Sequence, residues 1–269
     1  MKQSVAYWCL NSSEWQWSME QVCQLANELG FAGIELVPSE LLPEVRKHNL
    51  ICTLGVNGMP DPPFMRGVNN RRHHEEVIAS TKAAIDSCVE FQTPNVIAFT
   101  GYKWRDPENP ESEEIPRREA FENSVAALRT LAEYAAGKRV TVCLEHLNTR
   151  DDTHPMKGHP GYHGDDVDFC AGIVREVNSP FVRLLFDAYH VQVMHGDVIR
   201  RIRQNRDVIG HIHTAGNPGR NEIDGSQELY YPAIRRALEE IGYDGFIGHE
   251  FIPTRDPREG LAEAAEIFR

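Results

Sequence analysis

Four short apolar runs in the second half of the chain each end in a residue that can bind a divalent metal ion. The runs read VTVCLE, VRLLFD, VIGHIH and GFIGHE, and their last residues are Glu145, Asp187, His213 and Glu250. Runs this rich in β-branched and apolar residues are typical of strands buried on both faces, as in parallel sheets. Three carboxylates and an imidazole buried together are costly to desolvate unless a partner compensates their charge. The simplest such partner is a cation, so the pattern predicts a metal enzyme.

The rest of the chain must bring the ends of these runs together. Short apolar runs alternate with amphipathic segments at the spacing of βα units, and no Pro/Gly/Ser-rich linker divides the chain. The predicted strands span residues 4–9, 33–37, 51–56, 95–101, 140–145, 182–187, 208–213 and 245–250. The predicted helices span residues 18–30, 39–48, 73–91, 117–137, 166–177, 198–205, 227–241 and 256–269. Ser18 and Gln21 have the spacing of a capping box, and Gly30 is expected to end the first of these helices.

The chain has eight predicted βα units, and its length of 269 residues is close to the ~250 residues typical of a (β/α)8 barrel. We therefore predict an α/β fold, a single (β/α)8 TIM barrel, with residues 1–269 forming one domain. Neighbouring strands of such a barrel present their C-terminal ends to one shared mouth, where active sites lie. The long loops at 57–70, 101–116 and 148–165 follow strands rather than precede them, which is how a barrel builds a site on that face. Trp8, at the end of the first predicted strand, is expected either to line this pocket or to fill the core.

Charge and composition exclude several classes of partner. The formal net charge of −12 disfavours nucleic acid, because proteins that bind the phosphate backbone usually present a basic face. No stretch approaches the ~20 apolar residues of a membrane span, and the first residues lack the apolar core of a signal peptide. We expect a soluble, cytoplasmic protein. Its six cysteines form no CxxC pair, which favours free buried thiols.

The strings CLEHLNTRD, LLFDAYHVQ, HIHTAGNPGR and YDGFIGHEF resemble those of the xylose-isomerase-like TIM barrels, specifically the hydroxypyruvate isomerases and the related keto-sugar 3-epimerases. The resemblance implies that Glu145, Asp187, His213 and Glu250 bind one divalent metal and that the two glutamates also move protons. It implies further that His190 and Arg220 contact the substrate. Hydroxypyruvate isomerases often carry Gln where this chain has His213, whereas the epimerases carry His, so both substrates stay open.

The residue types predict the same chemistry without the family. Moving a carbonyl along a carbon chain requires removal of a proton from the carbon beside it, and a bound metal stabilises the resulting enediolate as a Lewis acid. Two carboxylates on opposite sides of the substrate, Glu145 and Glu250, can then act as acid and base. Oxygen ligands with one imidazole suit Mn²⁺ or Mg²⁺ best, with Co²⁺ or Zn²⁺ as alternatives. Arg220 offers a guanidinium fork matched to a substrate carboxylate.

Four functions remain to be separated. The first is an isomerase of a small hydroxy-oxo acid, of the hydroxypyruvate and tartronate semialdehyde type, favoured by Arg220. The second is a keto-sugar 3-epimerase with the same site. A metal-dependent lyase, decarboxylase or nuclease on this scaffold is the third, and the charge of −12 disfavours the nuclease. A sugar sensor is the fourth, although simple binding needs no acid–base pair. The partner is a small molecule in each favoured case, and a homo-oligomer is a candidate assembly because barrels of this type are often dimers or tetramers.

The remaining histidines are expected to be structural. His211 and His249 are predicted to face the barrel wall or the helix layer, and His146, next to Glu145, is left in doubt. A second group, His154, His159 and His163, falls in the 148–165 segment. These three lack tight spacing, so a solvated lid is favoured over a second metal site.

Overall fold

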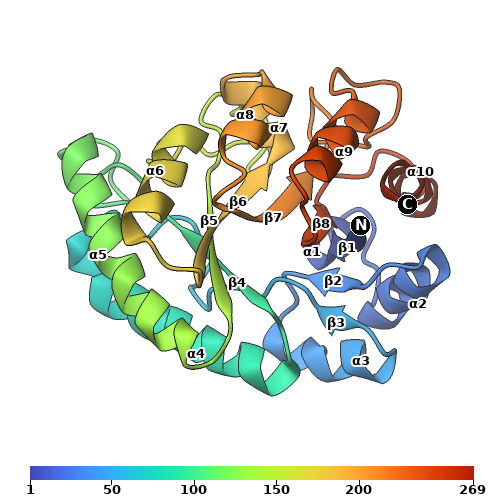
Figure 1. Ribbon diagram of the computed structural model, residues 1–269, viewed down its shortest axis with the longest axis horizontal. Helices are drawn as coiled ribbons and strands as arrows, with labels where there is room; N and C mark the ends of the chain where they lie inside the picture. Colours follow the sequence, from blue (N-terminus) through green and yellow to red (C-terminus); the bar gives the residue numbers. More distant parts are fainter.

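The computed structural model describes residues 1–269. Eight parallel strands form one sheet in the order β3-β2-β1-β8-β7-β6-β5-β4, curling around a common centre with the helices outside (Figure 1). The strands are β1 Lys2–Ala6, β2 Gly33–Glu35, β3 Ile51–Cys52, β4 Asn95–Phe99, β5 Thr141–Glu145, β6 Val182–Asp187, β7 Ile209–Thr214 and β8 Phe246–His249. All eight predicted strands are therefore present.

The two edge strands of this sheet, β3 and β4, meet just beyond the end of β3. Gly55 forms an isolated parallel bridge with Val96. The amide of Gly55 donates to the carbonyl of Asn95 at 2.8 Å, and the amide of Ile97 donates to the carbonyl of Gly55 at 3.0 Å. These bonds join the two ends of the sheet, and the α/β TIM-barrel prediction is confirmed.

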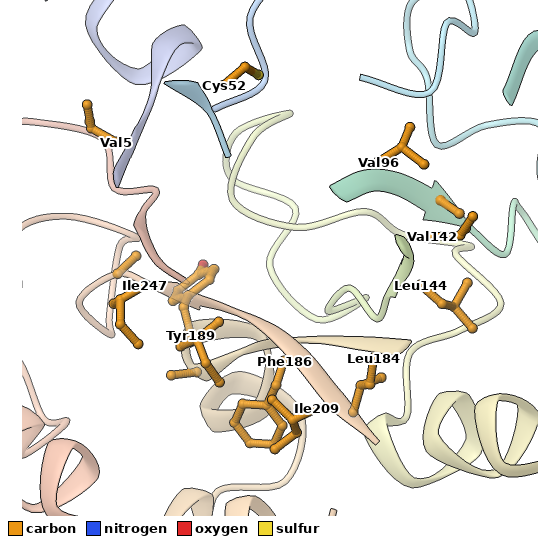
Figure 2. Packing of buried hydrophobic residues seen from close by; sticks show 14 of the residues in the cluster. Val5, Cys52, Val96, Val142, Leu144, Leu184, Phe186, Tyr189, Ile209 and Ile247 are labelled. Atoms are coloured by element: carbon orange, nitrogen blue, oxygen red, sulfur yellow. The ribbon is translucent and has the colours of Figure 1, made fainter. Parts of the chain in front are cut away.

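Side chains alternate between the two sides of the barrel wall. Even-numbered residues of β5 and β6 face the helices and belong to a buried cluster of 61 residues; Figure 2 labels Val142, Leu144, Leu184 and Phe186. Odd-numbered residues of the same strands, Cys143 and Leu185, belong to a separate cluster of 8 residues. Since successive strand residues point to opposite faces, this second cluster fills the barrel interior. Glu145 and Asp187 continue the inward-facing series.

The structure has ten α-helices: α1 Tyr7–Leu10, α2 Met19–Leu29, α3 Leu42–Lys47, α4 His74–Phe91, α5 Arg117–Ala136, α6 Val167–Val177, α7 Ala188–Met194, α8 Val198–Gln204, α9 Tyr231–Glu240 and α10 Pro257–Phe268. Two short 3₁₀ helices, η1 Ser39–Leu41 and η2 Arg71–His73, precede α3 and α4. Helices α1 and α7 were not expected from the sequence. The predicted capping box of α2 is confirmed, with Ser18 accepting from the amide of Gln21, and Gly30 ends the helix at φ 73°.

Helix α1 replaces the end of the first predicted strand. Strand β1 pairs with β2 only as far as Ala6, which lies opposite Glu35, and with β8 only as far as Val5. Beyond Ala6 the backbone has no ladder partner, and a helical turn satisfies its polar groups instead. Trp8 therefore projects from a helix rather than from a strand.

The prediction of free, buried cysteines is confirmed. All six cysteines are buried and unpaired. None of the helices combines the length and the apolar character needed to cross a bilayer.

Candidate metal centre at the barrel mouth

The four residues singled out in the sequence lie together at the C-terminal ends of adjacent strands. Glu145 and Asp187 are the last residues of β5 and β6, His213 lies in β7, and Glu250 directly follows β8. All four side chains are buried, and one ligand atom from each lies within 4.8 Å of the others. This is the clustering that the sequence predicts.

His213 lies at the centre of the group. Its Nδ1 is 2.9 Å from Glu250 Oε2 and 3.3 Å from Glu145 Oε1. The imidazole therefore turns Nδ1 toward the carboxylates at the mouth, and Nε2 lies on the opposite side of the ring. One nitrogen is thus directed into the candidate centre.

Asp187 offers one oxygen to this centre and uses the other locally. Its Oδ1 caps α7, accepting from the amides of Tyr189 at 2.7 Å and His190 at 3.1 Å. Its Oδ2 is buried and has no hydrogen-bond partner. A buried carboxylate oxygen left without a partner is costly, and a cation would satisfy it. The donor set of three carboxylates and one imidazole therefore fits a divalent ion such as Mn²⁺ or Mg²⁺.

The two glutamates have different proton affinities. Burial raises the pKa of Glu145 to about 7, although its hydrogen bond with His213 opposes the shift. Burial also acts to raise the pKa of Glu250, but the Arg220 guanidinium and His213 lower it to about 2. Burial disfavours the charged form of His213, but Glu250 and Glu35 raise its pKa well above the ordinary value. A pair of carboxylates whose pKa values are separated in this way suits a division into acid and base.

Trp8 and Arg220 hold Glu250 from two sides. The indole Nε1 of Trp8 donates to Glu250 Oε1 at 2.8 Å. Arg220 forms an ion pair with Glu250 Oε2 through Nη2, and its Nη1 donates to the carbonyl of Met156 at 2.6 Å. The guanidinium also lies over the rings of Trp8, at 5.3 Å, and Tyr189, at 5.7 Å. Arg220, which the family resemblance assigns to substrate contact, and Trp8, for which a pocket or a core position was expected, thus both border the metal centre.

His190 also borders the centre, from the first turn of α7. Its Nδ1 accepts from the backbone amide of Asn148 at 3.1 Å and lies 2.7 Å from the side-chain Nδ2 of the same residue. Its Nε2 is buried, has no hydrogen-bond partner and lies 3.7 Å from Asp187 Oδ2. Because Nδ1 accepts, the proton of a neutral ring is on Nε2. This imidazole therefore presents a free donor next to the candidate metal ligands.

The prediction for His211 is wrong. Residues 211 and 213 are two apart on β7, so their side chains point to the same side of the strand. His211 therefore faces the barrel interior, with Nε2 2.8 Å from Glu35 Oε2. Its neighbour Ile212 faces the helices.

His249 lies in the helix layer, one of the two positions expected for it, and His146, which the sequence left in doubt, contacts the backbone of β6. The His249 ring lies against Phe31 and Phe268, at centroid distances of 5.4 Å and 5.8 Å, in the helix layer. His146 Nε2 accepts from the backbone amide of Asp187 at 3.2 Å. Burial lowers the pKa of both rings, to about 4 for His249 and about 3 for His146, so both are neutral.

The histidines of the 148–165 segment form neither a metal cluster nor a solvated lid. His154 is exposed, whereas His159 and His163 are buried. The His159 ring lies 4.2 Å from that of Phe64, and His163 Nδ1 lies 3.1 Å from the side-chain amide of Asn69. The prediction of a solvated loop is wrong for these two residues, because each packs against a loop that follows another strand.

Glu35 is the residue of the site region that the sequence analysis missed. It is the last residue of β2, is fully buried, and forms a cluster with His211 and His213. The prediction extended this strand to Val37, which hid a carboxylate at a strand end. The same signal that identified the four candidate ligands could have found it, together with the paired histidines of β7, which need a buried acceptor.

Comparisons with known proteins agree with this geometry. The model of the xylose isomerase-like TIM barrel family matches residues 23–269. The chain is 38% identical over 130 residues to a 2-oxo-tetronate isomerase of Cupriavidus necator, covering 48% of this chain and 47% of that protein. It is 30% identical over 102 residues to the hydroxypyruvate isomerase of Escherichia coli, covering 38% and 39%. These alignments span less than half the length of either relative.

A solved structure extends the comparison over nearly the whole chain. The crystal structure of an AP endonuclease, family 2, from Brucella melitensis is 28% identical, has a TM-score of 0.83 and is covered over 99% of both chains. The strand order, the convergent ligand set and the family model all indicate one conclusion. The chain belongs to the xylose isomerase-like TIM barrel family.

Proposed function

We propose that the protein is a metal-dependent isomerase that moves a carbonyl group within a small hydroxy-oxo acid. The observation that carries the proposal is the convergence of Glu145, Asp187, His213 and Glu250, with ligand atoms within 4.8 Å of one another. A cation bound there would act as a Lewis acid for the negative charge that develops on the substrate oxygens. Names of two curated relatives, 2-oxo-tetronate isomerase and hydroxypyruvate isomerase, support the reaction class.

The two glutamates are the proposed proton carriers. Glu145 and Glu250 approach the centre from β5 and from the end of β8, with β6 and β7 between them. One carboxylate removes a proton from the hydroxymethyl carbon next to the carbonyl, the hydroxyl proton passes to the former carbonyl oxygen, and a proton returns to the former carbonyl carbon, so that hydroxypyruvate becomes tartronate semialdehyde. Asp187 and His213 hold the cation.

Arg220 and His190 are the proposed substrate-binding residues. Arg220 is buried, with 2% of its surface exposed, and its planar guanidinium fork matches a carboxylate. Binding of an anionic substrate would exchange the ion pair with Glu250 for one with the substrate. The free Nε2 of His190 supplies a hydrogen-bond donor to a substrate oxygen. A buried arginine at this position is the reason to favour an acid over a neutral sugar.

A keto-sugar 3-epimerase is the second candidate. The specific observation in its favour is the pair of aromatic faces, Trp8 and Tyr189, that both lie next to the Arg220 guanidinium. Aromatic walls of this kind line sites for larger, partly apolar ligands. The chemistry at the metal centre is common to both candidates, since each requires a proton to leave a carbon next to a carbonyl.

A nuclease is disfavoured, although one similar solved structure, at 28% identity, is of an AP endonuclease, family 2. The net charge of −12 gives the chain no electrostatic attraction for a phosphate backbone. The interaction of a metal centre with duplex DNA would have to overcome this repulsion. A small-molecule substrate does not carry the many phosphate charges that cause this repulsion.

Deuterium incorporation from D₂O tests the proposal. Metal-free protein reloaded with Mn²⁺ is incubated with a panel of three- to six-carbon hydroxy-oxo acids and keto-sugars, and products are followed by NMR. We expect turnover of a short acid with deuterium at the carbon that receives the proton. Exchange confined to C3 of a keto-sugar would identify the epimerase instead. The absence of exchange and turnover with every compound would contradict both candidates.

A further inference from the structure

Glu35 is held in the barrel interior by donors from three other strands or strand ends. Its Oε2 accepts from Ser4 Oγ at 3.2 Å and Thr53 Oγ1 at 3.1 Å, and lies 2.8 Å from His211 Nε2. None of the Glu35 side chain is exposed. Three donors on one oxygen fix both the position and the rotation of the carboxylate, because none of the three side-chain torsions can change without breaking them.

The second oxygen of Glu35 faces the candidate metal centre from below. Glu35 Oε1 lies 3.2 Å from His213 Nε2, and both atoms are buried without a hydrogen bond to any other group, so each is the nearest available partner of the other. The opposite ring nitrogen of His213, Nδ1, is the one that faces Glu145 and Glu250. The imidazole therefore connects a fixed carboxylate on one side with the candidate ligand cluster on the other.

We propose that Glu35 is a positioning residue for the metal centre. Its Oε1 holds the proton of His213 on Nε2, which leaves the lone pair of Nδ1 directed at the cation and prevents the ring from rotating away. A carboxylate that accepts from the far nitrogen of a ligating histidine also makes the near nitrogen more basic. The inference rests on the proposed function, because it requires that a cation bind at His213.

A second metal ion is the competing interpretation of the same atoms. Glu35, His211 and His213 also offer three ligand atoms within 4.8 Å of one another. However, the Oε2 of Glu35 already has three donors around it, and the Nε2 of His211 is directed at that same oxygen. An ion there would have to displace these hydrogen bonds. We therefore assign the cluster to hydrogen bonding and expect one metal ion per chain.

The backbone of β8 has room for this carboxylate only because residue 248 is glycine. A Cβ atom built on Gly248 would lie 1.7 Å from Glu35 Oε1 and 2.6 Å from its Cδ. Any larger residue would therefore push Oε1 away from its place below His213. The Glu35 carboxylate thus occupies the space that a side chain at position 248 would fill.

Titration of metal-free protein with Mn²⁺ by calorimetry tests the assignment. We expect Glu35→Gln to bind Mn²⁺ about 10–100-fold more weakly than wild type, with one ion per chain in both. The matched control is Glu222→Gln, since Glu222 is a carboxylate of similar burial that bonds only to Thr254 and Arg255. Its Mn²⁺ affinity should equal that of wild type. Melting curves of the metal-free variants separate lost affinity from lost folding.

The outcomes distinguish the two proposals. If wild type itself does not bind Mn²⁺, the proposed function fails. If wild type binds and Glu35→Gln binds equally well, only the positioning role fails. Binding of two ions per chain, with one lost in Glu35→Gln, would establish the second metal site and overturn our assignment.

A measurement on wild type decides the question if Glu35→Gln does not fold. Histidine ¹⁵N NMR of the Mg²⁺-loaded protein reports which ring nitrogen carries the proton. We expect one buried histidine with its proton on Nε2 and a Nδ1 resonance that shifts when Mg²⁺ is added. A metal-responsive histidine protonated on Nδ1 would contradict the role assigned to Glu35.

Discussion

Divalent cations should stabilise the folded protein through the candidate metal centre. Three carboxylates, Glu145, Asp187 and Glu250, are buried there against only two cationic groups, His213 and Arg220. One carboxylate oxygen, Asp187 Oδ2, has no hydrogen-bond partner at all. The unfolded chain does not bring these groups together, so a cation that binds them shifts the equilibrium toward the folded state.

The size of this effect follows from linkage. At a free Mn²⁺ concentration about 100 times the dissociation constant, binding adds about 2.7 kcal/mol to the free energy of unfolding. For a protein of this size, 1 kcal/mol corresponds to roughly 2–4 °C in melting temperature. Reloading the chelated protein with Mn²⁺ should therefore raise its melting temperature by about 5–11 °C.

Thermal melting with and without Mn²⁺ measures the effect, and two Asp→Asn variants locate it. Asp187→Asn removes the charge on the free oxygen, so most of the Mn²⁺-dependent rise should be lost. The control is Asp224→Asn, since Asp224 pairs with Arg255 at 2.7 Å and is not part of the ligand cluster. This variant should keep the full rise. A wild-type melting temperature that does not respond to Mn²⁺, or an equal response in Asp187→Asn, would refute the reasoning.

Three further predictions concern the glutamates and their support. Glu250→Gln should fold and yet lose about 10²–10⁴-fold in turnover, measured as kcat, and full activity would exclude the two-glutamate mechanism. Mn²⁺ affinity should increase between about pH 6 and about pH 8, because metal binding requires protons to leave Glu145 and His213. The pKa of Glu145 is raised to about 7, and the pKa of His213 is also raised. Calorimetry at stepped pH measures the affinity, and a flat or falling affinity would contradict the prediction. Tyr162→Phe should lower the free energy of unfolding by about 1–3 kcal/mol in urea titrations. The reason is that the phenol donates to the Glu145 carbonyl at 2.7 Å and accepts from the Thr100 amide at 2.8 Å, and a change within error would contradict it.

The strand ends of the barrel were predictable from the sequence because two independent patterns agree there. Apolar runs of five or six residues mark buried strands, and the polar residue that ends each run marks the mouth. In β5 and β6 the final Glu145 and Asp187 also have the inward parity of Cys143 and Leu185. The alternation along each strand and the position at its C-terminal end therefore both predict a side chain that faces the barrel interior. The convergence of these side chains could be predicted without knowledge of tertiary contacts.

The sequence could not show which polar residues meet inside the barrel. Glu35 and His211 are separated by 176 residues, and only closure of the sheet brings them within 2.8 Å. The boundary of β2 was also overestimated, since its pairing with β3 ends at Ile34 and Cys52. Trp8 was placed on a strand for a related reason, because the sequence does not say where a ladder partner is lost. These three misses concern contacts between distant elements, whereas the misplacement of His211 was an error in the parity of β7 itself.

The barrel interior has an apolar side and a polar side, and the polar side, called the polar layer below, lies next to the metal centre. The side toward β4, β5 and β6 is apolar, with residues such as Ile97, Cys143 and Leu185. The side toward β1, β2 and β7 is buried but polar, with Ser4, Thr53, Glu35 and His211. Replacing a buried ionic cluster by apolar side chains is often neutral or stabilising, so stability alone gives no reason for this polar layer. It meets the mouth where Glu35 Oε1 lies 3.2 Å from His213 Nε2. Orientation of that imidazole is therefore the physical effect that the layer can have on the chemistry above it.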